Sequence, residues 1–230
     1  MFLQIPNYHM ANEILYALSA SKKTSVGYLS RLTLQKILYL SGALSPLKDV
    51  LLEYLKFNAE MLGPYERRIQ NTVDHLVGIG LVDVAYFEET RKGGALTNYI
   101  ITDTGQIVVD RLIQYSNEEE KAWWISLVIS MTYSYLEASD LNGTVDEKVR
   151  TMVYQDPTYE PYRKNNLYRR LIDLSDKKGL TYQFIEFIKE YASHNGMLSP
   201  DLDERKKVAI MLVAFMEYLY TSVLNETTHE

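Results

Sequence analysis

The chain has 230 residues, 47% of them hydrophobic and 23% charged, which is typical of a globular protein and argues against intrinsic disorder. It contains no cysteine, which excludes a disulfide framework, a thiolate nucleophile and a Cys-based zinc site. Residues 1–115 carry 11 basic and 11 acidic side chains, whereas residues 116–230 carry 13 and 19. Because phosphate neutralisation supplies most of the affinity for duplex DNA, this balance argues against a stand-alone DNA-binding protein.

The first part of the chain is predicted to contain three helices, at about residues 10–21, 29–43 and 47–61. The second of these is too continuous in apolar residues for a surface helix, so we expect it to be central. The dipeptide Ser45-Pro46 separates it from the third helix.

Residues 63–112 change their hydrophobic period twice, in the order helix, strand, turn, strand, helix. Pro64 is expected in the first turn of a helix that ends near residue 78 or 80. Strands are predicted at 81–87 and 97–101 around a turn at Gly93-Gly94, and Thr102 or Thr104 is expected to cap the next helix. A hairpin after a recognition-type helix is typical of a wing, so we predict a winged helix-turn-helix.

The second half of the chain is predicted to be entirely helical, with a boundary near residues 114–117. Helices are expected from residue 116 or 117 to about 140, and at about 145–154, 164–176, 181–193 and 202–224, with a loop at 156–162. The predicted fold class is therefore mainly α. A winged-helix domain with a small β-hairpin wing (residues 1–115) precedes an all-α interaction domain (residues 116–230).

Catalytic and metal-binding motifs are absent from the sequence. His9, His75, His194 and His229 lie far apart with no HExxH spacing, and there is no phosphate-binding loop, dinucleotide fingerprint or nucleophile elbow. Acidic residues at 201–204 lie at a predicted helix start, where the helix dipole gives them a structural role. We therefore expect a protein that is not an enzyme and that uses no metal or cofactor.

Two groups of residues are candidates for binding. The predicted recognition helix and wing carry side chains of the types that contact DNA bases or phosphates: Arg67, Arg68, Gln70, Asn71, His75, Arg91 and Lys92. Acidic residues on or beside the same surface, Glu66, Asp74, Glu88 and Glu89, oppose that role. Weak DNA contact through phosphates, protein contact and a plain solvated face all remain open.

The other group is aromatic. The chain has 19 tyrosines, and tyrosine is enriched at protein interfaces because it offers a large contact area with a polar tip. The loop around residues 154–164 and the aromatic face of the helix after residue 116 form the candidate protein interface: Trp123, Trp124, Tyr154, Tyr159, Tyr162 and Arg163. A tyrosine-lined core is the alternative interpretation of the same residues.

Three segments carry a family resemblance: residues 32–40 (LTLQKILYL), 57–65 (FNAEMLGPY) and 76–82 (LVGIGLV). Together they resemble the SocA-like (Panacea) antitoxin domains and the middle components of ABC-three-component defence systems, a class that includes the Lamassu anti-phage systems. The long helical second half favours the middle components. This resemblance implies an adaptor subunit without catalysis of its own, which joins an SMC-like ATPase to an effector nuclease and contacts DNA weakly.

Two alternatives remain beside this adaptor hypothesis. The first is a stand-alone winged-helix transcription regulator, which predicts a homodimer and salt-dependent operator binding through Arg67, Arg68 or Arg91. The second is an antitoxin that neutralises a cognate toxin. In each case we expect a cytoplasmic protein without a membrane partner, because the N-terminus lacks the pattern of a secretory signal and the most apolar stretch, residues 208–224, has the spacing of a core helix.

Overall fold

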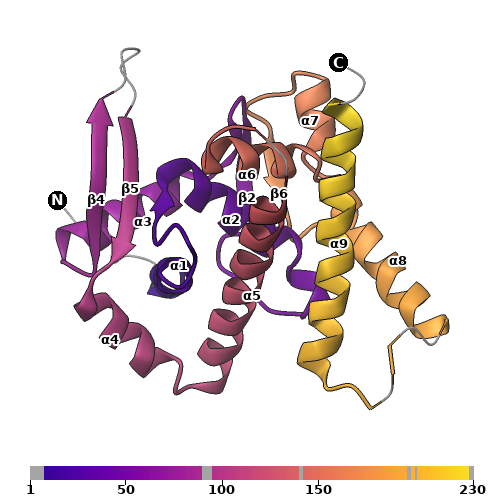
Figure 1. The fold of residues 1–230 in the computed structure, drawn as a ribbon, viewed down its shortest axis with the longest axis horizontal. Coiled ribbons are helices and arrows are strands. Elements are labelled where there is room, and N and C mark those ends of the chain that lie inside the picture. The colour runs from indigo at the N-terminus through magenta and orange to yellow at the C-terminus, as the bar shows by residue number, and fades with distance from the viewer. Residues whose placement is uncertain (1–7, 90–94, 140–141, 196–197, 200, 228–230) are drawn as a thin grey trace.

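The computed structural model describes residues 8–89, 95–139, 142–195, 198–199 and 201–227. The chain is mostly helical, with two small antiparallel sheets (Figure 1). This confirms the prediction of a mainly α protein.

The elements of the first half are α1 (Tyr8–Ser21), β1 (Leu29–Ser30), α2 (Arg31–Ala43), the 3-10 turn η1 (Ser45–Leu47), β2 (Lys56–Glu60), β3 (Gly63–Tyr65), α3 (Arg67–Gly78), β4 (Val82–Glu89), β5 (Ala95–Ile101) and α4 (Asp103–Leu112). Those of the second half are α5 (Ser116–Ala138), α6 (Val145–Tyr154), α7 (Glu160–Lys164), β6 (Leu171–Asp173), α8 (Leu180–His194) and α9 (Glu204–Thr227).

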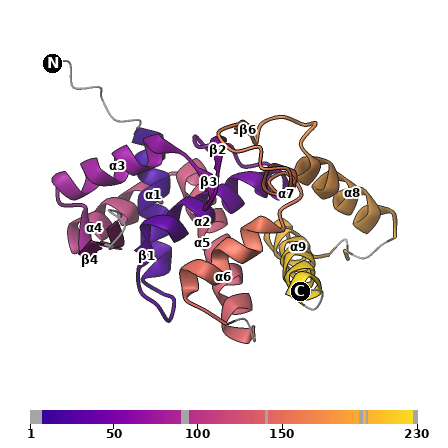
Figure 2. The same ribbon diagram turned by 90° about the horizontal axis from the view of Figure 1, so that it is seen from above.

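Helix α2 is the central element, as its apolar run predicts. Every residue from Thr33 to Ala43 is buried, and the hydroxyl group of Ser30 caps the first turn by accepting the N–H of Thr33 at 3.0 Å. The helix packs against α1, α5 and α6 and against strands of both sheets (Figures 1 and 2). Buried residues from both halves of the chain form one continuous core around it.

The first sheet has the strand order β1-β5-β4, with all pairs antiparallel. β4 and β5 form the predicted hairpin after α3, and β1, which lies between α1 and α2 in the chain, pairs with β5. A bulge between Val84 and Tyr86 shifts the register of the hairpin. Figure 1 shows this hairpin at one end of the molecule, with α8 and α9 at the other end.

The second sheet corrects two sequence predictions. The helix expected at 47–61 is absent: after η1 the chain becomes extended, and Phe57 and Ala59 alternate with more exposed neighbours in β2. The prediction that the second half is entirely helical was also wrong, because β6 pairs with β2 and completes the order β3-β2-β6. Such a short strand has no detectable period of its own, and only pairing with a distant segment defines it.

Several helix boundaries also differ from the predictions. Pro64 lies in β3 opposite Ala59, and α3 starts later, at Arg67, because the side chain of Glu66 caps it. The prediction of a helix at 164–176 is wrong, because positive φ values at Asn166 (53°) and Arg169 (65°) turn the chain into β6. Helix α7 instead begins inside the predicted loop at 156–162.

Helix α9 has the length and apolarity of a segment that could cross a membrane over Glu204–Asn225. One of its faces is buried in the core through Leu212, Phe215, Met216 and Leu219, and it packs against α5 and α6. Charged residues at its start pair with neighbouring helices, as between Arg205 and Glu119 at 2.8 Å.

Candidate interaction surface

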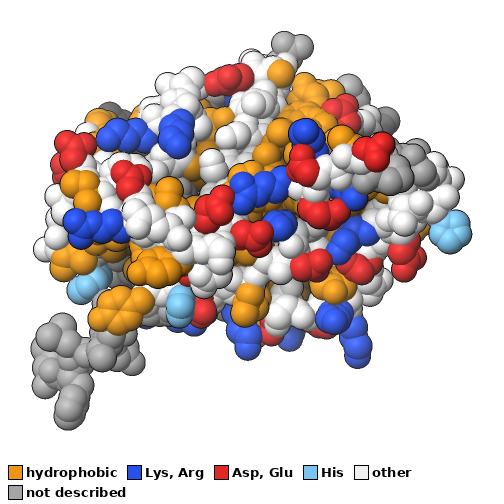
Figure 3. Space-filling model, turned by 90° about the horizontal axis from the view of Figure 1, so that it is seen from below, with side chains coloured by type: hydrophobic (Ala, Val, Ile, Leu, Met, Phe, Trp, Pro, Cys, Tyr) orange, Lys and Arg blue, Asp and Glu red, His pale blue; other side chains and the backbone are white. Residues whose placement is uncertain are grey.

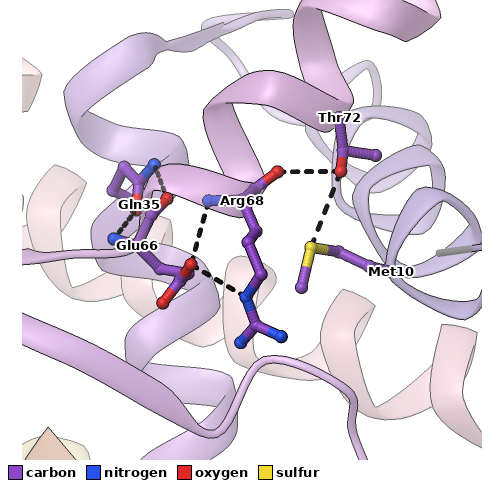
Figure 4. Close-up of polar contacts among 5 residues, drawn as sticks. All are labelled: Met10, Gln35, Glu66, Arg68 and Thr72. Atoms are coloured by element: carbon purple, nitrogen blue, oxygen red, sulfur yellow. Dashed lines mark hydrogen bonds and ion pairs between the residues drawn. The ribbon is translucent and has the colours of Figure 1, made fainter. Parts of the chain in front are cut away.

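A buried glutamine fixes the start of α3. The amide of Gln35 on α2 accepts the N–H of Glu66 at 2.9 Å and donates to its carbonyl oxygen at 3.1 Å (Figure 4). The Glu66 carboxylate in turn accepts both the backbone N–H and the side-chain Nε of Arg68 at 2.9 Å. One turn later, the hydroxyl group of Thr72 donates to the Arg68 carbonyl oxygen at 2.8 Å. Helix α3 is therefore held by hydrogen bonds at its first turn, before any packing is counted.

The next residue of α2, Lys36, packs against Gly63. Gly63 has a φ of +101°, and a Cβ atom at this position would lie 2.7 Å from Cε of Lys36, so both the backbone conformation and the space require glycine. Burial lowers the pKa of Lys36 to about 8, and repulsion from Arg150 on α6 makes a smaller contribution in the same direction. Two parts of the family resemblance, residues 32–40 and 57–65, thus meet in the interior.

The exposed stripe of α3 contains three of the predicted DNA-contacting residues. Arg67, Asn71 and His75 are exposed and are spaced four residues apart, so they share one face of the helix. Asp74 is exposed beside them. This stripe therefore carries Arg67 and Asp74, which are of opposite charge, together with the polar side chains of Asn71 and His75.

The other predicted DNA contacts are placed differently. Gln70 is turned inward and donates to the hydroxyl group of Tyr99 at 2.9 Å and to Asp74 at 2.7 Å. Arg68 is exposed but is engaged by Glu66. Arg91 and Lys92, predicted for the wing tip, lie outside the described residues. The sequence pattern of α3 could not separate Gln70 from Asn71, because adjacent helical residues differ in direction by about 100° and only tertiary packing decides which is covered.

The hairpin beside α3 exposes apolar and acidic side chains. Relative exposure is 37% for Val84, 49% for Tyr86, 59% for Phe87 and 43% for Leu96. Every residue of β4 after Val82 is exposed, including Asp83, Glu88 and Glu89. Such a surface is unfavourable for phosphate groups, which require positive charge, and it resembles the surfaces of protein interfaces.

On the underside of the molecule, positive and negative side chains are interspersed. Figure 3 views the molecule from below, the side on which α5 and α9 begin, and shows basic and acidic residues side by side. On α5 and α9 they form pairs such as Lys207 with Glu204 at 2.8 Å, while Glu120 pairs with Lys48 at 3.3 Å. The described residues on this side do not form a continuous cationic face suited to nucleic acid.

Two residues predicted for the protein interface belong to the core instead. Trp124 is 0% exposed, and its indole N–H donates to the Ser41 carbonyl oxygen at 2.9 Å. Tyr159 is also 0% exposed, and its hydroxyl group donates to the Glu60 carbonyl oxygen at 2.6 Å. Both therefore follow the alternative interpretation of an aromatic core, in which the polar tip of each ring finds a backbone acceptor.

The remaining four candidates are half-buried and contact other parts of the chain. Trp123 lies under two cations, with Arg205 5.1 Å and Lys48 6.0 Å from its ring centre. The guanidinium group of Arg163 lies 5.3 Å from the ring centre of Tyr154, whose hydroxyl group donates to the Met61 carbonyl oxygen at 2.8 Å. The Tyr162 hydroxyl group donates to the Leu171 carbonyl oxygen at 3.4 Å. Tyr154 and Tyr162 therefore support the second sheet, whereas Trp123 packs against the start of α9.

Sequence analysis missed two buried polar clusters. In one, Asp156 accepts hydrogen bonds from Tyr39 at 2.7 Å and from Thr181 at 2.8 Å, and burial raises the pKa of its carboxyl group. In the other, Lys121 pairs with Glu13 at 3.3 Å and with Glu118 at 3.7 Å. A signal was available in the sequence only for Glu13, which lies with Asn12 between the apolar residues Ala11 and Ile14.

Neither cluster has the accessibility of an active site. Burial raises the pKa of Glu13 to about 7, which would suit a general acid or base, but Glu13 is 0% exposed and offers no surface to a substrate. Asp156 is equally buried. Among the described residues, no group of three or more His, Asp or Glu side chains could hold a metal ion.

A pocket of about 230 Å³ lies between the hairpin and the start of α6. Its walls include three tyrosines, Tyr28, Tyr86 and Tyr133, together with Asp146 and Leu96. One carboxylate oxygen of Asp146, Oδ1, accepts hydrogen bonds from the hydroxyl groups of Ser30 and Thr33. The pocket is therefore aromatic and acidic.

The sequence matches no protein-family model and no curated protein of known function. The functional assignment consequently depends on the exposed residues of α3, the β4–β5 hairpin and the pocket below it.

Proposed function

We propose that this chain is a non-enzymatic adaptor subunit, built on a winged-helix unit, that binds other proteins within a larger assembly. The order α1, β1, α2, α3, β4, β5, with β1 paired to β5, supports the winged-helix assignment of the first half. In that assignment α3 is the recognition helix and the β4–β5 hairpin is the wing. The inserted strands β2 and β3 separate α2 from α3.

One observation carries the adaptor proposal: the wing exposes Val84, Tyr86 and Phe87 and adds acidic groups beside them. Exposed apolar side chains cost free energy in water and are offset when a protein partner covers them. The partners that the sequence resemblance suggests are an SMC-like ATPase and an effector nuclease of a bacterial anti-phage system. The absence of cysteine fits a cytoplasmic assembly, and the core-facing side of α9 fits a chain without a membrane partner.

Affinity purification from the native host tests this proposal. The tagged chain is eluted at moderate salt and its partners are identified by mass spectrometry, with a Val84→Ser, Phe87→Ser double variant purified in parallel. We expect the wild-type chain to retain an ATPase and a nuclease and the variant to lose at least one of them. Recovery of the wild-type chain alone would overturn the proposal.

Direct DNA binding is the second candidate, favoured by the exposed stripe of Arg67, Asn71 and His75. This function predicts a duplex complex that weakens steeply with salt and on changing Arg67→Ala. Fluorescence anisotropy with a labelled duplex at two salt concentrations distinguishes the candidates, because the adaptor proposal predicts only weak binding.

A further inference from the structure

Strand β4 is an open edge of the first sheet. Among the strands that the structure describes, it pairs only with β5, and Figure 1 shows it on the outside of the molecule. An edge strand presents unpaired backbone N–H and C=O groups that can accept another strand. At eight residues β4 is long enough for such pairing.

The charges on β4 favour a basic partner over a second copy of this chain. An antiparallel pairing of the whole strand Val82–Glu89 with itself would place Asp83 opposite Glu88 twice, and like charges facing each other destabilise a sheet. The same two carboxylates, with Glu89, would attract lysine or arginine on a partner strand. The acidic groups thus act against self-association and in favour of a cationic segment.

Only the Tyr86 side of the pocket lies near such a strand, because β4 and β5 lie between the added strand and β1, whose Ser30 binds Asp146. Tyr86 lines this pocket, and an added strand would lie roughly 4.8 Å from β4. Every second side chain of that strand would point to the same face as Tyr86. An aromatic ring beside a carboxylate favours an ammonium or guanidinium group, and on β4 the Tyr86 hydroxyl group donates to the carboxylate of Glu88 at 2.5 Å.

We propose that β4 accepts an extended basic segment of a partner protein as an additional strand, with its lysine or arginine side chains facing Asp83 and Glu88 and lying against the ring of Tyr86. This inference rests on the adaptor function proposed above and adds the chemistry of the partner and its place of docking.

A defined peptide tests it. The probe is a capped, fluorescein-labelled octapeptide of alternating lysine and valine, and two control peptides replace either the lysines with glutamate or the valines with proline. The lysine–proline peptide keeps the charge but cannot form a strand ladder, because proline lacks the N–H group. We expect the lysine–valine peptide alone to bind the full chain and to slow hydrogen exchange in residues 82–89.

Charge reversal provides the matched variants. The variant Asp83→Lys, Glu88→Lys is expected to bind the basic peptide at least about tenfold more weakly and to gain binding of the glutamate–valine peptide. The control Glu190→Lys, on the exposed side of α8, should leave the affinity within about twofold. Tyr86→Ala, which removes the aromatic ring from β4 without changing charge, should weaken binding of the basic peptide by about threefold or more.

Three results would overturn the inference. They are equal binding of the lysine–proline peptide, protection from exchange outside β4, or a dimer that dissociates on changing Asp83 and Glu88. The inference also fails separately from the adaptor function: if the charge-reversed chain still recovers its ATPase and nuclease from the host, the adaptor stands and β4 is not the docking strand. If the wild-type chain recovers no partner, the adaptor proposal itself fails.

Discussion

Helix α2 and the β4–β5 hairpin use polar and apolar side chains in opposite ways. The helix buries Gln35, Lys36 and Tyr39 in the centre of the molecule, where Gln35 and Tyr39 have hydrogen-bond partners. The hairpin exposes Tyr86 and Phe87 to solvent. Buried polar groups define how neighbouring segments meet, whereas exposed apolar groups are available to another molecule. Buried polar contacts thus place α2 at the centre of the fold, and the proposed function assigns partner binding to the hairpin.

Among the substitutions that test this comparison, Asp156→Ala is expected to have the largest effect on stability. Asp156→Ala leaves the hydroxyl groups of Tyr39 and Thr181 and the N–H groups of Thr158 and Tyr159 without their common acceptor. We expect the free energy of unfolding to fall by about 3–5 kcal/mol. Urea denaturation measures it, with the exposed Glu190→Ala as control. A loss below about 1 kcal/mol would show that the cluster does not organise the core.

A pH effect of similar size is expected from Glu13. Because the pKa of Glu13 rises from 4.5 to about 7 on folding, the folded chain binds the proton more tightly than the unfolded chain does. Stability should therefore fall by on the order of 3 kcal/mol as pH rises from about 4.5 to 7. Urea midpoints across this range, compared with those of Glu13→Gln, measure it: the variant should lose this part of the slope. An unchanged slope in the variant would contradict the assignment.

Gln35→Ala should have an intermediate effect. The substitution removes both hydrogen bonds that hold Glu66, and it leaves the buried N–H of Glu66 unpaired. We expect about 2 kcal/mol of destabilisation and faster hydrogen exchange in the first turn of α3. Gln183→Ala on the exposed side of α8 is the matched control. If hydrogen exchange in α3 of the Gln35 variant is as slow as in the wild-type chain, packing alone fixes the position of this helix.

The smallest effect on stability is expected in the hairpin. Phe87→Ser removes a ring that is 59% exposed, so the free energy of unfolding should change by less than about 0.5 kcal/mol. Thermal and urea unfolding measure this, and the same variant should weaken partner recovery from the host. A large loss of stability would place Phe87 in the structural group with α2 and remove the contrast between the two regions.

Local patterns in the sequence predicted the elements whose period is long enough to recognise. The helical spacing of Ile69, Val73 and Leu76 predicted α3, and the alternation around Gly93-Gly94 predicted the hairpin strands. Three-residue β6 and the extended stretch that contains β2 were missed, because their structure comes from pairing with each other across more than a hundred residues. The residues of the candidate site were likewise predicted only in part. The exposed Arg67, Asn71 and His75 follow from the helical period, but the inward turn of Gln70 does not.

The sequence by itself determined the helical class, the central position of α2, the hairpin after α3 and the lack of a charge excess in the first half. These properties depend on composition and on periods within a single segment. Only the tertiary structure decided that Trp124 and Tyr159 are core residues, that Lys36 meets Gly63, and that Tyr28, Tyr86, Tyr133 and Asp146 share one pocket. The physical reason is that the burial of an aromatic or charged side chain depends on which distant segment packs over it, and a local pattern carries no information about that segment.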